Sequence, residues 1–232
     1  TGNPVTNNDG SIASTVRANP SAGFSIVGWS GQSGTNTLGH GLNAAPELII
    51  LKDRTNAGAW VVGSDYIGWG NRLELNTTAA ASSASADFNS TAPTSSVFTT
   101  GSNQSSGNKI AYCFAPVNSY SAMGSYVGNG NASGPFVYTG FRSRFILIKR
   151  SDGTANWQIY DTARDPYNAM DSRIKANASD AEVSNAGYNL DVTSNGFRPT
   201  GGNNDNYNAS GGTYIYYAVA ENPFQANGGL AR

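Results

Sequence analysis

The chain contains the run Leu48-Ile49-Ile50-Leu51-Lys52 and repeats it, with small changes, as Phe145-Ile146-Leu147-Ile148-Lys149. Both runs are almost wholly apolar, and both are shorter than the roughly ten residues that a buried helix needs. A short continuous apolar run is typical of a central strand that is buried on both faces of a sandwich. The two runs therefore predict an all-β fold with one such strand in each half.

Other landmarks recur around these runs, in the same order in both halves. The period is close to the size of a domain, whereas solenoid repeats are about 20–50 residues long. This pattern predicts an internal duplication. The recurring pairs are Val27 with Val127, Lys52 with Lys149, Trp60 with Trp157, Phe98 with Phe197, and Ile110 with Ile215.

The length of 232 residues allows two domains of about 100 residues each. We predict an extended lead-in over residues 1–22, a first repeat over 23–117 and a second repeat over 118–232. Each repeat is expected to be a β-sandwich of jelly-roll type. Residues 77–86 and 171–186 are rich in alanine but lack a helical apolar stripe, so they are predicted to be irregular loops with at most a turn or two of helix.

Composition argues against several classes of partner. Only 12% of residues are charged and the formal net charge is -1, so the basic surface that binds nucleic acid is not expected. No apolar stretch approaches the roughly 20 residues that cross a bilayer, and the chain is expected to be soluble and free of membrane. The single cysteine, Cys113, lies in an apolar run and is interpreted as a buried residue.

The residues that catalysis commonly uses do not form a recognisable set. The only histidine, His40, lies between two glycines, and Gly28-Trp29-Ser30-Gly31-Gln32 lacks the last glycine of a nucleophile elbow. The carboxylates show no strand-borne pair typical of glycosidases. Loop aspartates such as Asp152 and Asp205 have no calcium-binding spacing. We therefore predict no enzymatic activity, no cofactor and no metal, with polysaccharide cleavage as the enzymatic alternative.

Tryptophans offer the remaining indication of a binding site. Trp60 and Trp157 are interpreted as core residues. Trp69 stands in Gly68-Trp69-Gly70-Asn71-Arg72, a segment expected to be exposed, where an indole could stack on a sugar while Asn71 and Arg72 bond its hydroxyls. Trp29 is the second candidate. The alternative is that these indoles pack against a neighbouring subunit or domain.

Several longer motifs resemble a particular class of protein, namely the C-terminal domain of tail-fibre and related appendage proteins of marine bacteriophages. The resemblance covers the chain from Ser14 onward, and the motifs that carry it include Gly39-His40-Gly41-Leu42, Ile110-Ala111-Tyr112-Cys113-Phe114-Ala115 and Asn208-Ala209-Ser210-Gly211-Gly212-Thr213.

This resemblance implies a structural and attachment module of a virion. Its expected partners are copies of itself, other virion proteins and host-surface glycans, and it supplies no catalytic residues. A lectin-like carbohydrate-binding module, a polysaccharide depolymerase and a head-associated fibre remain the alternatives.

Overall fold

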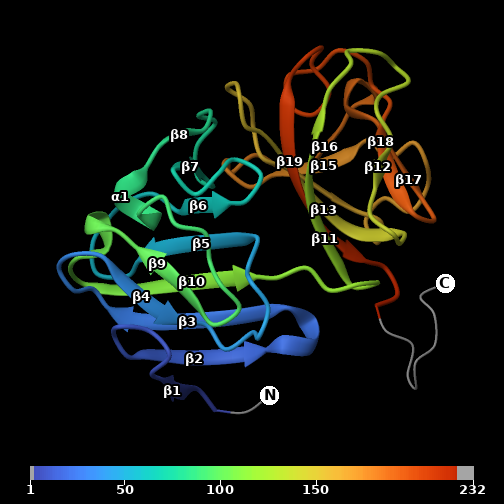
Figure 1. Cartoon of the computed structure of the whole chain (residues 1–232). Helices are drawn as coiled ribbons and strands as arrows, with labels where there is room; N and C mark the ends of the chain where they lie inside the picture. Colours follow the sequence, from blue (N-terminus) through green and yellow to red (C-terminus); the bar gives the residue numbers. More distant parts are fainter. Residues whose placement is uncertain (1–2, 224–232) are drawn as a thin grey trace. The chain divides into compact units, whose positions relative to one another are not determined.

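A computed structural model describes residues 3–223 of the chain, and these residues form antiparallel sheets with a few single turns of helix (Figure 1). The prediction of an all-β fold is confirmed. The chain divides into two compact units. Unit 1 comprises residues Thr1–Leu75 and Ala81–Pro116, and unit 2 comprises Asn76–Ala80 and Val117–Arg232. No helix in the described part of the chain is long and apolar enough to span a membrane.

Unit 1 is built on an eight-stranded sheet with the order β1-β2-β3-β10-β5-β6-β7-β8. A two-stranded sheet, β4 with β9, contributes Leu38 and Phe98 to the core that it shares with the large sheet. The bounds are β1 Val5–Asn7, β2 Ser14–Asn19, η1 Pro20–Ala22, β3 Phe24–Ser30, β4 Asn36–Gly39, β5 Leu48–Asp53, β6 Val61–Ser64, β7 Asn71–Glu74, β8 Ser82–Ser83, α1 Ser85–Phe88, β9 Val97–Thr100, η2 Ser102–Gln104 and β10 Asn108–Phe114.

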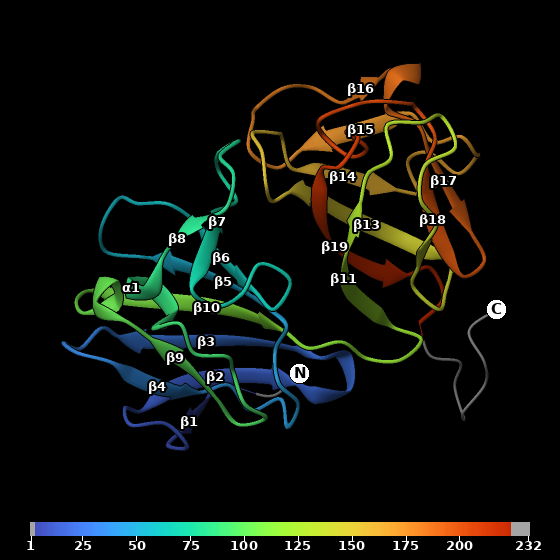
Figure 2. The ribbon, with the colours of Figure 1, turned by 45° about the horizontal axis from the view of Figure 1, so that its top comes forward.

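Unit 2 has a six-stranded sheet with the order β11-β19-β13-β14-β15-β16 and a three-stranded sheet with the order β12-β18-β17 (Figure 2). Side chains of both sheets again form one core, in which Tyr160, Tyr207 and Tyr214 are fully buried. The bounds are β11 Ser121–Val127, β12 Val137–Tyr138, β13 Ser143–Arg150, β14 Gln158–Asp161, β15 Ser172–Lys175, β16 Val183–Ser184, η3 Ala186–Tyr188, β17 Leu190–Thr193, β18 Gly196–Pro199 and β19 Thr213–Ala220.

The large sheets of the two units share one strand order, since β3-β10-β5-β6-β7-β8 corresponds to β11-β19-β13-β14-β15-β16. Lys52 lies opposite Ile110 in unit 1, and Lys149 lies opposite Ile215 in unit 2. Both runs that predicted the fold are central strands, β5 and β13. This agreement supports the duplication, which stays a prediction.

One proposed pair does not match by strand register. Val27 lies opposite Ala111, the residue after Ile110, whereas the residue after Ile215 lies opposite Gly124. Val27 therefore corresponds to Gly124 and not to Val127. The predicted pairing was wrong by three residues because neighbouring strands, and not local similarity, set the register.

The corrected register brings two aromatic residues into equivalent places. Trp29 now corresponds to Tyr126. Trp29 packs edge-on against Phe98 with ring centroids 5.8 Å apart, and Tyr126 packs edge-on against Phe197 at 6.1 Å. The same edge-to-face contact therefore recurs in both cores, with an indole in one and a phenol in the other.

Residues 1–22 are not an unpacked lead-in, so that prediction was wrong for the part that the structure describes. They contain β1 and β2, which extend the sheet of unit 1 beyond β3. In β2, Ser14 and Val16 are buried while Thr15 and Arg17 are exposed. This alternation is a strand pattern, but small polar residues obscure it in the sequence.

The two alanine-rich stretches are less irregular than predicted. Each includes a two-residue strand, β8 or β16, and a single turn of helix follows, α1 or η3. Asp87 is the third residue of α1 and Tyr188 is the third residue of η3. These two positions carry different chemistry in the two units, as described below.

Candidate functional site

Trp69 is a core residue of unit 1, so the prediction of an exposed indole was wrong. It is 6% exposed, packs edge-on against Phe88 with centroids 5.2 Å apart, and donates its Nε1 hydrogen to the carboxylate of Asp65. Its ring and that of Phe88 together fill the space over Gly63, where a Cβ would lie 2.6 Å from Phe88 and 2.8 Å from the indole. By strand register Tyr160 occupies the Gly63 position in unit 2. In unit 1, side chains from outside the strand thus fill the volume over Gly63, whereas in unit 2 the strand residue Tyr160 stands at this position.

Asn71 and Arg72 are engaged within unit 1. The Asn71 side chain donates to the Ile67 carbonyl at 2.7 Å and closes the turn before β7. Arg72 forms ion pairs with Glu74 and Asp87, both at 2.9 Å. Both side chains are therefore engaged by other groups of unit 1. They do not stand beside an exposed Trp69, as binding of a stacked sugar would require.

Trp29, the second candidate, is also buried, at 6% exposed. Its ring belongs to the same core as Trp69, and its Nε1 has no hydrogen-bond partner among the described residues. The four predicted site residues therefore do not form a surface platform. Their burial does not support a glycan contact centred on Trp69.

A charged cleft of about 360 Å³ lies between the sheet of unit 1 and the short helices α1 and η2. Asp87, 1% exposed, accepts hydrogen bonds from Arg72, from Asn103 at 3.0 Å and from Gln104 at 3.1 Å. Lys109 pairs with Asp53 at 2.6 Å, and this hydrogen bond is the largest cause that holds the Asp53 pKa well below its usual range. The charges of these residues are matched by close partners, which is the arrangement of a structural ion-pair network.

The equivalent region of unit 2 has different side-chain contacts. Arg173 corresponds to Arg72 by strand register. Its guanidinium donates to Gln158 at 2.8 Å and lies 3.4 Å from the centre of the Tyr188 ring. A cation–π contact with Tyr188 thus takes the place of the ion pair with Asp87, so the charged cleft is a feature of unit 1.

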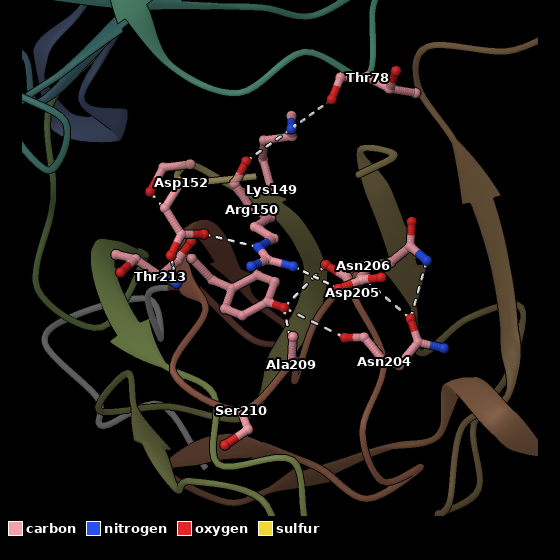
Figure 3. A network of polar contacts seen from close by, with 12 residues as sticks. Thr78, Lys149, Arg150, Asp152, Asn204, Asp205, Asn206, Ala209, Ser210 and Thr213 are labelled. Atoms are coloured by element: carbon pink, nitrogen blue, oxygen red, sulfur yellow. Dashed lines mark hydrogen bonds and ion pairs between the residues drawn. The ribbon is translucent and has the colours of Figure 1, made fainter. Parts of the chain in front are cut away.

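Unit 2 instead carries a polar network that includes Arg150, Asp152 and Asp205 (Figure 3). Arg150 forms ion pairs with Asp152 and with Asp205. The hydroxyl of Tyr214 donates to the Asp205 carbonyl at 3.0 Å and accepts from the Ala209 amide at 2.8 Å. These bonds tie the loop before β19 to β13. Within residues 3–223, no group of three or more His, Cys, Asp or Glu side chains could hold a metal ion.

Lys149 lies at the edge of this network and is fully buried. Its ammonium donates to the carbonyls of Arg150 at 2.8 Å and Thr78 at 3.3 Å. Its pKa is lowered from 10.5 to about 8, mainly by burial and also by the charge of Arg150, while the charge of Asp152 acts in the opposite direction. The protein therefore buries a cation that donates hydrogen bonds to two carbonyl oxygens.

We expect the stability of unit 2 to rise with pH as Lys149 loses its proton. The folded pKa is about 8 and the ordinary value is 10.5, so the unfolded chain binds more protons between these pH values and unfolding becomes less favourable as pH increases. Urea unfolding of wild type and Lys149→Met at pH 7, 8.5 and 9.5 tests this. The difference in unfolding free energy between Lys149→Met and wild type should shift against the variant as the pH rises, because only the wild type gains stability by losing the Lys149 proton. Lys175→Met is the control. Parallel pH profiles for wild type and Lys149→Met would contradict the expectation.

His40 and Cys113 are enclosed in unit 1. Nδ1 of His40 accepts from the Leu42 amide at 3.2 Å, which leaves Nε2 to donate to the Thr94 carbonyl at 3.1 Å. Burial lowers the His40 pKa against the opposing effects of Thr94 and Asp9, and burial raises the pKa of Cys113 to about 12. Both ring nitrogens are thus occupied by backbone groups, and the thiol is held in its protonated form.

A groove of about 630 Å³ crosses β2, β3 and β10 on the face of the unit 1 sheet opposite the core. Gly28 lies at its centre, paired with Thr15 on one side and Ile110 on the other. Arg17 and Arg54 line it, and its lining includes no aspartate or glutamate.

A protein-family model described as a domain of unknown function, DUF7483, matches residues 1–223. The chain belongs to this family. No curated protein and no solved structure matches the chain.

Sequence reasoning missed the groove of the DUF7483 domain, although two signals were present. Gly28 interrupts a strand pattern, and a glycine inside a strand often marks close approach of a ligand or another backbone. The second is the segment from Ser14 to Arg17, which alternates between buried and exposed residues, although small polar side chains obscure this strand pattern in the sequence. Neither signal identifies a site until the pairing of β2 with β3 places Thr15 beside Gly28.

Proposed function

We propose that this domain is a non-catalytic structural and attachment module of a bacteriophage virion appendage, of the tail-fibre type, and that it assembles with copies of itself. The sequence motifs support the virion assignment by resemblance. The observation that carries the assembly proposal is the outer edge of β11 in unit 2, where none of the described strands pairs and Val117 alone forms a bridge, to Ser121.

The equivalent edges of the two units differ. In unit 1, β3 pairs with β10 on one side and with β2 on the other. In unit 2, β11 pairs with β19, and among the described residues no strand pairs with its other side. The chain passes from Phe114 at the end of β10 to Ser121 at the start of β11 through a short turn. This connection is too short to supply a counterpart of β2.

The backbone of β11 points its hydrogen-bonding groups outward at the open edge. Thr213 donates its amide hydrogen to Asp152 at 3.0 Å and accepts from the Ser151 amide at 2.8 Å, so its polar groups face away from β11. Val127, opposite Thr213, must therefore point its own N–H and C=O toward the open edge, as must Ser125 two residues earlier.

The edge also lacks the usual protection against strand pairing. Ser121–Val127 contains no charged residue and no proline, and Val127 is 58% exposed. Natural proteins commonly protect edges with such residues because an open edge is a template for another chain. Two copies of β11 can pair antiparallel about a two-fold axis, which uses the same strand in both subunits.

Ser125→Pro is expected to convert the oligomer to a monomer. Proline removes an outward N–H without removing a bond to β19, because edge positions tolerate it. Ser125→Val keeps the N–H and is the matched control, expected to remain oligomeric. Light scattering over a range of concentrations measures the assembly. A monomeric wild type at high concentration, or a Ser125→Pro variant that assembles like wild type, would contradict the proposal.

A carbohydrate-binding module, a polysaccharide depolymerase and a head-associated fibre are the competing functions. Incubation with host polysaccharide separates the first two, because a binding module leaves the polymer intact and a depolymerase releases oligosaccharides. We expect no release. Imaging of labelled protein on intact particles distinguishes tail from head, and we expect the tail.

A further inference from the structure

We propose that the groove over β2, β3 and β10 binds an acidic saccharide, meaning a sugar that carries a carboxylate or a sulfate. This inference does not depend on assembly through β11, because unit 1 alone supplies the residues of the groove. Its volume of about 630 Å³ lies within the roughly 300–1,000 Å³ of small-molecule sites.

The hollow at the centre exists because Gly28 has no side chain. A Cβ at Gly28 would meet no atom nearer than the Thr15 carbonyl oxygen at 3.8 Å. Ile26 and Ile110 flank the hollow on β3 and β10 and are partly exposed. A shallow apolar floor of this kind suits the C–H face of a pyranose ring. A site for a bare inorganic anion does not need such a floor.

The charge of the groove is positive although the chain carries a net charge of -1. Arg17 and Arg54 line it, and in the described part of the chain the Arg54 guanidinium makes no hydrogen bond or ion pair. The Arg54 backbone amide donates to the Asn108 carbonyl at 2.7 Å, which fixes the chain at the groove wall. Lys109 also belongs to the lining, but its ammonium is paired with Asp53.

Polar side chains complete the lining. Gln32 is exposed, and Ser30 donates to the Asn108 amide oxygen at 3.2 Å, so hydroxyl and amide groups lie beside the apolar floor. Sugar hydroxyls need such paired donors and acceptors, and guanidinium groups bind carboxylate or sulfate with two parallel bonds. Two arginines are few for a nucleic-acid backbone, whose proteins contact many phosphates.

The described residues of unit 2 differ at this place. The equivalent of Gly28 there is Ser125, and none of the described strands lies in the place of β2. The proposal therefore predicts one site per chain, located in unit 1.

Isothermal titration with trigalacturonic acid, a sulfated galactose trisaccharide and neutral galactotriose tests the proposal. We expect the acidic sugars to bind one per chain with a dissociation constant on the order of 0.1–1 mM, to bind more weakly at high salt, and to bind at least about tenfold more tightly than galactotriose. Inorganic sulfate at the same concentration should not displace them.

Three variants locate the site. Gly28→Val should abolish binding by filling the hollow, with unchanged thermal stability because a Cβ fits there and valine favours strands. Arg54→Gln should weaken binding about tenfold or more. Arg198→Gln removes an exposed arginine of β18 in unit 2 and should leave binding unchanged.

Equal binding of galactotriose, displacement by sulfate alone, or unchanged binding by both Gly28→Val and Arg54→Gln would overturn the proposal. Absence of binding by all three sugars would overturn it as well. The titration is repeated on Ser125→Pro, since a groove in unit 1 should bind equally whether or not the chains assemble. A monomeric wild type that binds the acidic sugars would show that only the assembly proposal has failed, and a wild type that assembles without binding them would show that only the saccharide proposal has failed.

Discussion

Trp69→Ala is expected to destabilise unit 1 by about 3–5 kcal/mol, the usual cost of removing a buried aromatic side chain. The indole is 6% exposed and packs on Phe88 over Gly63, so truncation leaves a cavity in the core. It also leaves the Asp65 carboxylate without the indole hydrogen that it accepts.

Urea unfolding followed by circular dichroism measures this effect. Tyr167→Ala is the control, because Tyr167 is 80% exposed and its loss should change the unfolding free energy by less than about 0.5 kcal/mol. A Trp69→Ala variant as stable as wild type would show that the indole is not packed in the core.

Asp87→Ala is expected to destabilise unit 1 by a similar amount, about 3–5 kcal/mol, because it breaks a buried ion pair by removing one partner. Asp87 is 1% exposed and receives hydrogen bonds from Arg72, Asn103 and Gln104. Its loss leaves three converging donors without their shared acceptor in the cleft.

The matched control is Asp180→Ala, which removes an exposed partner of Lys175 and should leave the unfolding midpoint nearly unchanged. A double variant, Asp87→Ala with Arg72→Met, should recover part of the lost stability because the unpaired guanidinium is gone. If Asp87→Ala unfolds at the same urea concentration as Asp180→Ala, the cleft is not held by this carboxylate.

Much of the fold follows from local patterns. The runs starting at Leu48 and Phe145 are short, apolar and bounded by polar residues, and the structure places them in β5 and β13. Trp60 and Trp157 were paired by sequence alone, and each accepts a backbone hydrogen bond, Trp60 from Leu75 at 2.9 Å and Trp157 from Ala176 at 3.2 Å. Strand periodicity involves near neighbours in the chain, so it can be recognised without the fold.

The candidate site, in contrast, could not be predicted from local sequence patterns. Glycine neighbours indicated that Trp69 is exposed, whereas Gly63 on the adjoining strand provides the space that buries it. Arg72 was expected to bind a ligand, but Asp87 on α1 reaches it across the cleft. Each outcome depends on a residue from another element, which sequence spacing cannot place.

The sequence by itself thus determined the all-β class, the central strands of each half and the low charge of the chain. Only the tertiary structure decided that β2 pairs with the edge of β3 while none of the described strands pairs with the outer edge of β11, and that Gly28 opens a groove beside Arg54. The physical reason is that backbone propensity and side-chain alternation are local properties. Burial, ion pairing and the shape of a surface depend instead on cross-strand neighbours, which are distant in the sequence.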